Sequence, residues 1–221
     1  MKTLQTIFLL IFGLSISSSC GKKKENEFVE FRFMVPLTIT PAKDTINLGD
    51  ILTLEANFSD SVQEFHSGKR YKLENFDFRT RAALNKLGDT TKSVSRAPGN
   101  AGMYMVINEV GTFTITSESF ARPRFLYEQN RYRLKVKLVP RQRGVSCIGF
   151  FSAYVGSYTP PTFPVQSSAN QKPMLTNILY YVNGGKTNFE LYRRNSKVGD
   201  TVINIDSRNY EMEATWTFYV K

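Results

Sequence analysis

The sequence predicts an all-β protein folded as a sandwich of two sheets, and three stretches carry this prediction. Apolar and polar residues alternate with period two in Arg131–Val139, in Leu52–Phe58 and in Met212–Val220. Successive side chains of a strand point to opposite faces, so this period places an apolar row against a core and a polar row toward solvent. The hydrophobic content of 41% and the aromatic content of 13% supply enough apolar surface for such a core.

The first strands are predicted in the N-terminal part of the chain. Phe28–Val35 alternates, with Phe31 and Phe33 on the inward face. Gly49-Asp50 is typical of a turn, and the alternating strand Leu52–Phe58 follows it directly. The inward row of this second strand consists of Leu52, Leu54, Ala56 and Phe58.

The middle of the chain is less regular. Arg70–Phe78 is predicted as a strand, and Arg79–Gly88 either extends it or forms a short helix ended by Gly88. The Gly, Pro, Ser and Asn content of residues 88–102 indicates a loop. Two further strands are expected at Met103–Ile107 and Thr112–Thr116.

The next segment contains a strand that we expect at the centre of a sheet. Val145–Val155 is apolar almost throughout, as a strand covered on both faces requires. Cys147 lies within it and is interpreted as a small buried hydrophobic residue. Gly156–Pro173 carries four of the nine prolines and is predicted as a long irregular excursion.

The C-terminal part allows two interpretations. Asn183-Gly184 is typical of a hairpin turn between two strands. Alternatively, Asn188–Ser196 forms a short helix capped by Thr187. In either case Met212–Val220 is expected to complete a sheet, and residues 29–221 are expected to form a single β-sandwich domain with long loop insertions.

The N-terminus is typical of a secretory signal peptide. Lys2 precedes an apolar run from Ile7 to Ile16, which is too short to cross a bilayer core of roughly 30 Å. Cys20 directly follows three serines, and this arrangement resembles the lipobox of bacterial lipoproteins. The resemblance implies that residues 1–19 are cleaved, that Cys20 carries palmitate-type acyl chains, and that residues 20–28 form a charged tether.

The residues after Cys20 indicate the destination. Gly21 stands where an Asp signals retention in the inner membrane, so the outer membrane is favoured. Lys24–Glu27 partly resembles the signal that displays Bacteroidota lipoproteins on the cell surface. Whether the protein faces the periplasm or the cell surface stays open.

The chain is basic. Removal of Lys2 leaves 28 basic residues against 19 acidic ones, a net charge of +9. An exported lipoprotein does not routinely meet nucleic acid, so the expected acidic partners are lipid phosphates, envelope glycans or an acidic protein. A row of cations on one strand face is the candidate binding surface for such a partner. The alternative is that these cations are solvated and discourage pairing with the edge of another strand. The row consists of Arg131, Arg133, Lys135 and Lys137 and is continued by Arg141 and Arg143.

No catalytic, metal or cofactor motif is complete. His66 is the single histidine and lies in a polar, turn-like stretch, so it is interpreted as a solvated loop residue. Residues 144–149 have one residue too many for a nucleophile elbow, and Tyr180 stands where a P-loop requires Gly. One His and one free Cys cannot form a usual zinc site. We therefore expect that the protein is not an enzyme. A hydrolase with paired catalytic carboxylates is the third function class, after the two binding functions given below.

Two further sets of residues are candidate sites. The aromatic side chains Tyr154, Tyr158 and Phe163 either form a loop that binds a sugar or a protein partner, or pin that loop to the core. Four tripeptides that begin with Asp-Ser or Asp-Thr resemble the O-glycosylation acceptor of Bacteroidota, although Asp-Thr is also ordinary turn chemistry. Their acceptor residues are Thr45, Ser61, Thr90 and Thr201.

The lipobox-like start, the Gly49-Asp50 turn and the alternating last strand together resemble the immunoglobulin-like outer-membrane lipoproteins of Bacteroidota, a group without an assigned substrate. The resemblance implies an immunoglobulin-like β-sandwich that acts as a non-enzymatic interaction module or accessory subunit of an envelope or transport assembly. The alternative is a glycan-binding lipoprotein for polysaccharide capture that uses the 154–163 aromatics.

Overall fold

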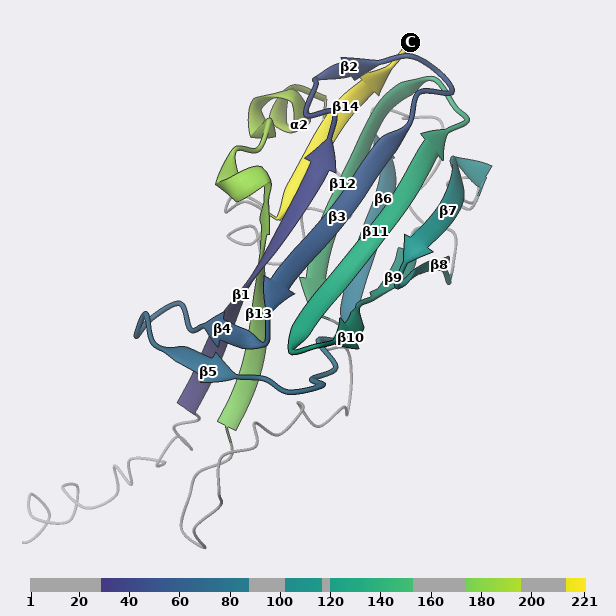
Figure 1. Ribbon diagram of the computed structural model, residues 1–221. Helices are drawn as coiled ribbons and strands as arrows, with labels where there is room; N and C mark the ends of the chain where they lie inside the picture. Colours follow the sequence, from purple (N-terminus) through teal and green to yellow (C-terminus); the bar gives the residue numbers. More distant parts are fainter. Residues whose placement is uncertain (1–28, 88–101, 117–119, 153–173, 196–213) are drawn as a thin grey trace, which may run out of the picture.

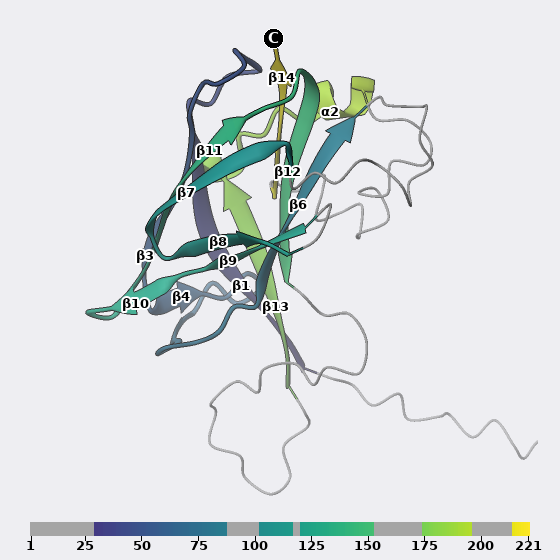
Figure 2. The ribbon, with the colours of Figure 1, turned by 90° about the vertical axis from the view of Figure 1, so that its right-hand side faces the viewer.

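The computed structural model describes residues 29–87, 102–116, 120–152, 174–195 and 214–221. Within them the chain is mostly β, and two six-stranded sheets pack face to face as a sandwich (Figures 1 and 2). This confirms the predicted sandwich of two sheets. The predicted signal peptide, Cys20, its tether, the 156–173 excursion and most of the loop predicted at 88–102 lie outside the described residues. No helix in the described part of the chain is long and apolar enough to cross a bilayer.

The first sheet contains the strand that opens the domain. Its order is β10 (Leu126–Glu128), β11 (Arg131–Pro140), β3 (Leu52–Ser59), β1 (Val29–Thr40) and β13 (Met174–Val182), and β7 (Tyr104–Val110) also pairs with β11. β1 and β13 run parallel over nine residue pairs, whereas the other pairs of this sheet are antiparallel. Two segments far apart in sequence therefore form one edge of the sheet.

The second sheet contains the end of the described chain. Its order is β2 (Thr45–Ile46), β14 (Thr215–Val220), β12 (Gly144–Ser152), β6 (Thr80–Leu87), β9 (Phe120–Arg124) and β8 (Thr112–Ile115). β2 runs parallel to β14, and the remaining pairs are antiparallel. A separate two-stranded hairpin consists of β4 (Ser61–Gln63) and β5 (Arg70–Lys72).

One large core fills the space between the two sheets, and the alternating rows of the sequence form it. The inward residues of β11 are 0–2% exposed, as predicted. Each fully buried side chain of this size contributes roughly 1.5–3 kcal/mol relative to an exposed one. The main contributors are Phe33, Val35, Leu37, Ile39, Leu52, Leu54, Ala56, Phe58, Tyr132, Leu134, Val136, Leu138, Ala82, Leu84, Ile148, Phe150, Trp216 and Phe218.

β12 is buried on both faces, as its continuous apolar sequence predicts. Ile148 and Phe150 face the main core. Cys147 faces the other way, is free and fully buried, and packs with Leu87 and with Tyr192 of helix α2 (Phe189–Asn195). The helix therefore covers the outer face of the second sheet at this point (Figure 1).

The strand predicted for Arg70–Phe78 is wrong beyond Lys72. β5 ends at Lys72, and the chain then turns, with Asn75 and Arg79 in the left-handed region at φ 47° and 46°. The Tyr132 hydroxyl fixes this turn by donating to the Leu73 carbonyl and accepting from the Phe76 amide. Tertiary hydrogen bonds thus override the alternating pattern. The open question at 79–88 resolves as strand β6.

The hairpin predicted at Asn183-Gly184 is also wrong, and the helix interpretation is correct. Asn183, Gly184 and Gly185 form a 3-10 turn with positive φ values. The Asn183 side-chain oxygen accepts the Ile39 amide at 2.8 Å, so the turn is bonded to β1 instead of joining two paired strands. The helix begins at Phe189, which makes Asn188 and not Thr187 the residue that precedes it.

Candidate functional site

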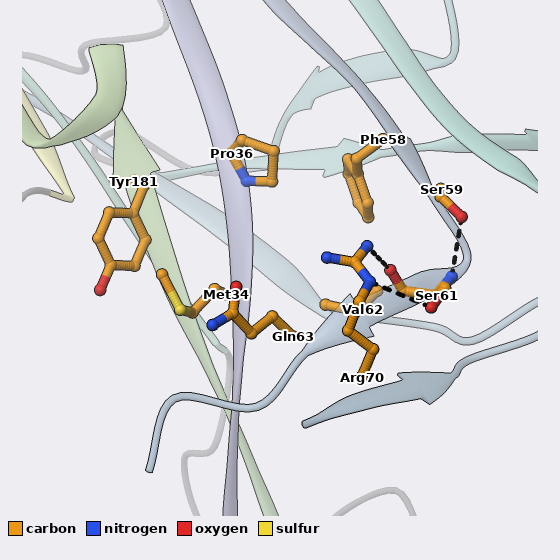
Figure 3. A pocket seen from close by; sticks show the side chains of 9 residues that line it. All are labelled: Met34, Pro36, Phe58, Ser59, Ser61, Val62, Gln63, Arg70 and Tyr181. Carbon is orange, nitrogen blue, oxygen red and sulfur yellow. Dashed lines mark hydrogen bonds between the residues drawn. The ribbon is translucent and has the colours of Figure 1, made fainter. Parts of the chain in front are cut away.

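A cavity of about 320 Å³ opens on the outer side of the first sheet, where β1 parts from β3 (Figure 3). Its walls come from β1, β3, β13 and the β4–β5 hairpin. Apolar side chains dominate, and a single cation, Arg70, is among them. The lining residues are Met34, Pro36, Phe58, Ser59, Ser61, Val62, Gln63, Arg70 and Tyr181.

Pro36 accounts for the opening between the strands. The β1–β3 ladder pairs Thr40 with Thr53 and Thr38 with Glu55, and its register would next pair Pro36 with Asn57. Proline has no backbone N–H, so it cannot donate the hydrogen bond that would continue the ladder. The pairing stops at Thr38, and the two strands diverge below it.

The β4–β5 hairpin occupies the lower part of this gap. It is joined to β1 by an antiparallel bridge between Phe33 and Glu64 and by a 2.7 Å hydrogen bond from the Phe65 amide to the Arg32 carbonyl. Tyr71 of the hairpin meets the ring of Phe33 edge-on, with 5.9 Å between centroids. The hairpin therefore forms the floor of the cavity.

The Glu64 side chain is the electrostatic anchor of this hairpin. It is 3% exposed, and its carboxylate accepts the amides of Ser67 at 2.7 Å and of His66 and Arg32 at 3.2 Å each. Burial alone raises the pKa of this carboxyl, but hydrogen bonds from Ser67, His66 and Arg32 outweigh it and lower the pKa to about 2. The group is thus a buried anion that organises backbone amides.

Arg70 is held in place by Ser61 on the neighbouring strand. Its Nε donates to the Ser61 hydroxyl at 3.2 Å, and its Nη2 donates to the Ser61 carbonyl. The remaining guanidinium nitrogen points into the cavity, below the ring of Phe58 (Figure 3). Among the described residues no carboxylate forms an ion pair with Arg70.

The predicted basic row lies on the outer face of β11, but much of its charge is neutralised by carboxylates. Glu109 of β7 pairs with Lys135 at 3.2 Å and also with Lys137, and these hydrogen bonds, that of Lys137 first, lower the pKa of Glu109. Arg133 pairs with Glu128. Arg131 donates to the side chain of Asn57 at 2.9 Å. Such a face attracts a polyanion less than four unpaired cations would.

Arg141 and Arg143 behave differently from the rest of the row. Both are exposed in the connection between β11 and β12, and no ion pair to either occurs among the described residues. They lie near an end of the sandwich where large apolar side chains are also exposed. Exposed fractions there are 48% for Ile51, 38% for Met105 and 41% for Ile107.

The strand register brings these apolar residues onto one face of the first sheet. The register pairs Leu138 with Leu52 and Val139 with Met105, so Ile51, Val139 and Met105 form a row across β3, β11 and β7. Ile107 lies two residues beyond Met105 on the same face of β7. Leu48, 42% exposed, lies in the adjoining turn. We call Leu48, Ile51, Met105 and Ile107 the distal apolar patch.

Other residues singled out from the sequence are dispersed. His66 is exposed in the hairpin turn, whereas Cys147 is buried under α2. Thr45 is exposed on β2, while Ser61 is half-buried and bonded to Arg70. No group of three or more metal-ligating side chains occurs among the described residues. The remaining predicted site residues lie outside the described ones: Cys20, Thr90, Tyr154, Tyr158, Phe163 and Thr201.

Neither the cavity nor the role of Arg70 was predicted from the sequence. A signal for the cavity was present, since Pro36 interrupts an alternating strand and proline is excluded from the middle of a hydrogen-bonded ladder. The orientation of Arg70 has no comparable signal, because it depends on where the hairpin folds.

Similarity to known proteins is found among solved structures. No protein-family model and no curated protein matches the chain. Among solved structures it is similar to the type II cohesin dyad from the adaptor ScaA scaffoldin of Acetivibrio cellulolyticus, with a TM-score of 0.22 and 13% sequence identity. The match covers 70% of this chain and 46% of that one, so this chain spans about half of its length.

Proposed function

We propose that this protein is a non-enzymatic, lipid-anchored outer-membrane protein whose immunoglobulin-like sandwich docks an envelope partner protein through the distal apolar patch. It would serve as an interaction module or accessory subunit of an envelope or transport assembly. The exposed patch at the end of the sandwich opposite the start of β1 is the observation that carries this proposal.

The strand order supports the immunoglobulin-like part of the proposal. In that fold one sheet has the order A-B-E-D and the other contains C, F and G. The series β1, β3, β11 and β10 corresponds to A-B-E-D, and β6, β12 and β14 correspond to C-F-G. β13 is then an additional strand between F and G that joins the sheet beside A, and β8 and β9 are additions next to C.

The position of the anchor gives the patch its orientation. β1 begins at Val29, nine residues after Cys20, and its twelve residues run from one end of the sandwich to the other (Figure 1). At about 3.3 Å per residue, the strand spans roughly 40 Å. With acyl chains on Cys20, the start of β1 would lie nearest the membrane and the distal apolar patch would face away from it.

The chemistry of the patch indicates its partner. Contiguous exposed apolar side chains mark interaction sites, because their burial is favourable only when another surface covers them. Arg141 and Arg143, exposed near the patch, favour a partner that surrounds its own apolar residues with carboxylates. We therefore propose an envelope protein with an acidic, partly apolar docking surface.

The test is a mild-detergent pull-down of the tagged, lipidated protein from its own membranes, followed by mass spectrometry. The proposal predicts one membrane protein in equimolar amount and its loss from the double variant Ile51→Ser/Met105→Ser. Leu126→Ser is the matched control, because Leu126 is also exposed, at 37%, but lies on β10 at the other end. A photo-crosslinker at position 48 should join the same partner.

Two results would contradict the proposal. Partner capture that survives the double variant would exclude the patch as the docking surface. An empty pull-down, together with stabilisation of the protein by envelope polysaccharides, would favour polysaccharide capture instead. The anchor has its own test, since Cys20→Ala should release the protein from membranes or leave it unprocessed.

A further inference from the structure

We infer that the cavity between β1 and β3 is a binding site for a small organic anion, namely a carboxylate or phosphate carried on an apolar body. The inference is independent of the docking proposal, because the cavity lies at the β4–β5 hairpin and the distal apolar patch at the opposite end of β1 (Figures 1 and 3).

The size of the cavity limits the ligand. Its volume of about 320 Å³ is at the lower end of the range of small-molecule sites. It corresponds to roughly ten water molecules at about 30 Å³ each. A ligand with one ring or a short chain and one charged group fits this space.

The apolar walls favour the body of such a ligand. Met34 and Pro36 of β1 form one side, Phe58 lies across from them, and Tyr181 adds an aromatic ring from β13 (Figure 3). A thioether, a pyrrolidine ring and two aromatic rings present adaptable apolar contacts. Covering them with an apolar group removes exposed hydrocarbon from water.

Arg70 supplies the recognition of charge. The Ser61 hydroxyl and carbonyl hold its Nε and Nη2, so the guanidinium is oriented before a ligand arrives. Its third nitrogen points into the cavity and meets no carboxylate of the described residues. Since Nε and Nη2 are bonded to Ser61, this third nitrogen is the group that can donate charge-assisted hydrogen bonds to a carboxylate or phosphate oxygen. The polar groups of Gln63 and Ser59, also in the lining, are available to further ligand oxygens.

The experiment uses the chain from Gly21 to Lys221 and three probes: phenylacetate, phenyl phosphate and the neutral phenylacetamide. Binding is followed by NMR through the methyl signals of Met34 and Val62. Because Arg70 is exposed on its outer side, we expect Kd values in the millimolar range. At least one anion should bind saturably and at least tenfold more tightly than phenylacetamide, and the preferred anion distinguishes carboxylate from phosphate ligands.

Two variants and a control complete the test. Arg70→Gln should weaken binding of the preferred anion at least tenfold. Gln63→Trp should abolish it by filling the cavity while leaving the guanidinium intact, so the test stands even if Arg70→Gln loosens the hairpin. Arg141→Gln, which removes an exposed cation elsewhere, should leave the Kd unchanged. Equal binding of phenylacetamide, no saturable shift with either anion, or full binding to Gln63→Trp would overturn the inference.

Discussion

The register of β1 and β3 would place Pro36 opposite Asn57, but the ladder between the two strands ends at the pair Thr38–Glu55. The Asn57 carbonyl, which would accept an N–H from position 36, instead accepts Nη2 of Arg131 at 3.4 Å. A single missing donor thus separates two strands, and the cavity and the hairpin floor both depend on that separation.

Replacing Pro36 by Val should extend the ladder, because valine restores the N–H and favours extended backbone. We expect the β1–β3 pairing to reach position 36, the cavity to become smaller, and the amide hydrogens of residues 37 and 38 to exchange at least severalfold more slowly. Amide hydrogen exchange resolved by NMR measures this directly.

Thr38→Val is the control for the Pro36 variant. Thr38 is exposed on the same strand and already paired with Glu55, so this change raises β propensity without adding a backbone donor. If Thr38→Val slows exchange as much as Pro36→Val does, the missing donor is not the cause of the opening.

Glu64 should make the stability of the protein depend on pH in the acid range. Its pKa is about 2 in the folded protein, below the ordinary value of 4.5, so between these values the unfolded chain binds more protons than the folded one. Its contribution is complete above pH 4.5 and is lost as the pH falls to 2. The full contribution is on the order of 3 kcal/mol. Urea unfolding of wild type and Glu64→Gln at several pH values measures the difference.

The difference between these two proteins should be largest near neutral pH and should nearly vanish at pH 2. Glu74→Gln is the control, because Glu74 is exposed and its 3.0 Å pair with Lys72 lies in solvent. A solvent-exposed pair of this kind contributes little to stability. A Glu64→Gln difference that stays constant from pH 7 to pH 2 would show that the charge of Glu64 does not stabilise the hairpin.

The sandwich was predictable from the sequence because its strands are amphipathic or uniformly apolar. Tyr132 and Leu134 of β11 alternate with cations, and Cys147 lies in a run that only a strand buried on both faces explains. In each case local periodicity and tertiary burial agree. The pattern misled where a side chain from another element decided the conformation, as the Tyr132 hydroxyl does for Leu73 and Phe76.

The candidate site was not predictable in the same way. Arg70 looks like any exposed residue of a polar stretch, and its role depends on Ser61 and on the gap made by Pro36. Likewise, the row beginning at Arg131 was expected to be a basic face, but Glu109 comes from a strand whose register the sequence does not reveal. Charges that pair across strands are a property of the fold.

Asn188 should be important for the attachment of α2. Its side-chain amide pairs with both backbone groups of Thr217: the oxygen accepts the amide at 2.8 Å, and the nitrogen donates to the carbonyl. The Asn188 side chain thereby continues the hydrogen bonding along the edge of β14 past the residues that pair with β2. Asn188→Ala leaves both groups without this partner, which costs about 1–3 kcal/mol for each group that stays buried.

Thermal and urea unfolding of Asn188→Ala measure this cost. Asn195→Ala is the matched control, because the side-chain bond of Asn195 among the described residues is to Leu191 of the same helix, at 2.7 Å. We expect a loss several times smaller for the control. Equal losses for the two variants would mean that the Asn188–Thr217 pairing adds nothing beyond the helix itself.

Gly111 between β7 and β8 should tolerate no side chain. Its φ is 65°, and a Cβ at this position would lie 2.4 Å from the backbone carbonyl oxygen of Arg124. Gly184 has the same φ, but nothing lies within 4 Å of its added Cβ. Alanine in the left-handed region costs roughly 1–2 kcal/mol, and overpacking adds about 1–3 kcal/mol. Gly184→Ala should therefore show only the cost of the left-handed backbone. Gly111→Ala should show that cost and the cost of overpacking.

Urea unfolding of the two alanine variants separates conformational strain from steric conflict. Because the contact is with backbone, relief requires the β7–β8 turn to move away from β9, and the β8–β9 pairing of Thr112 with Arg124 should exchange its amide hydrogens faster. Equal destabilisation by the two substitutions would mean that this turn yields to the extra atom without cost. The close approach of Gly111 to Arg124 would then not be what fixes the turn between the two sheets.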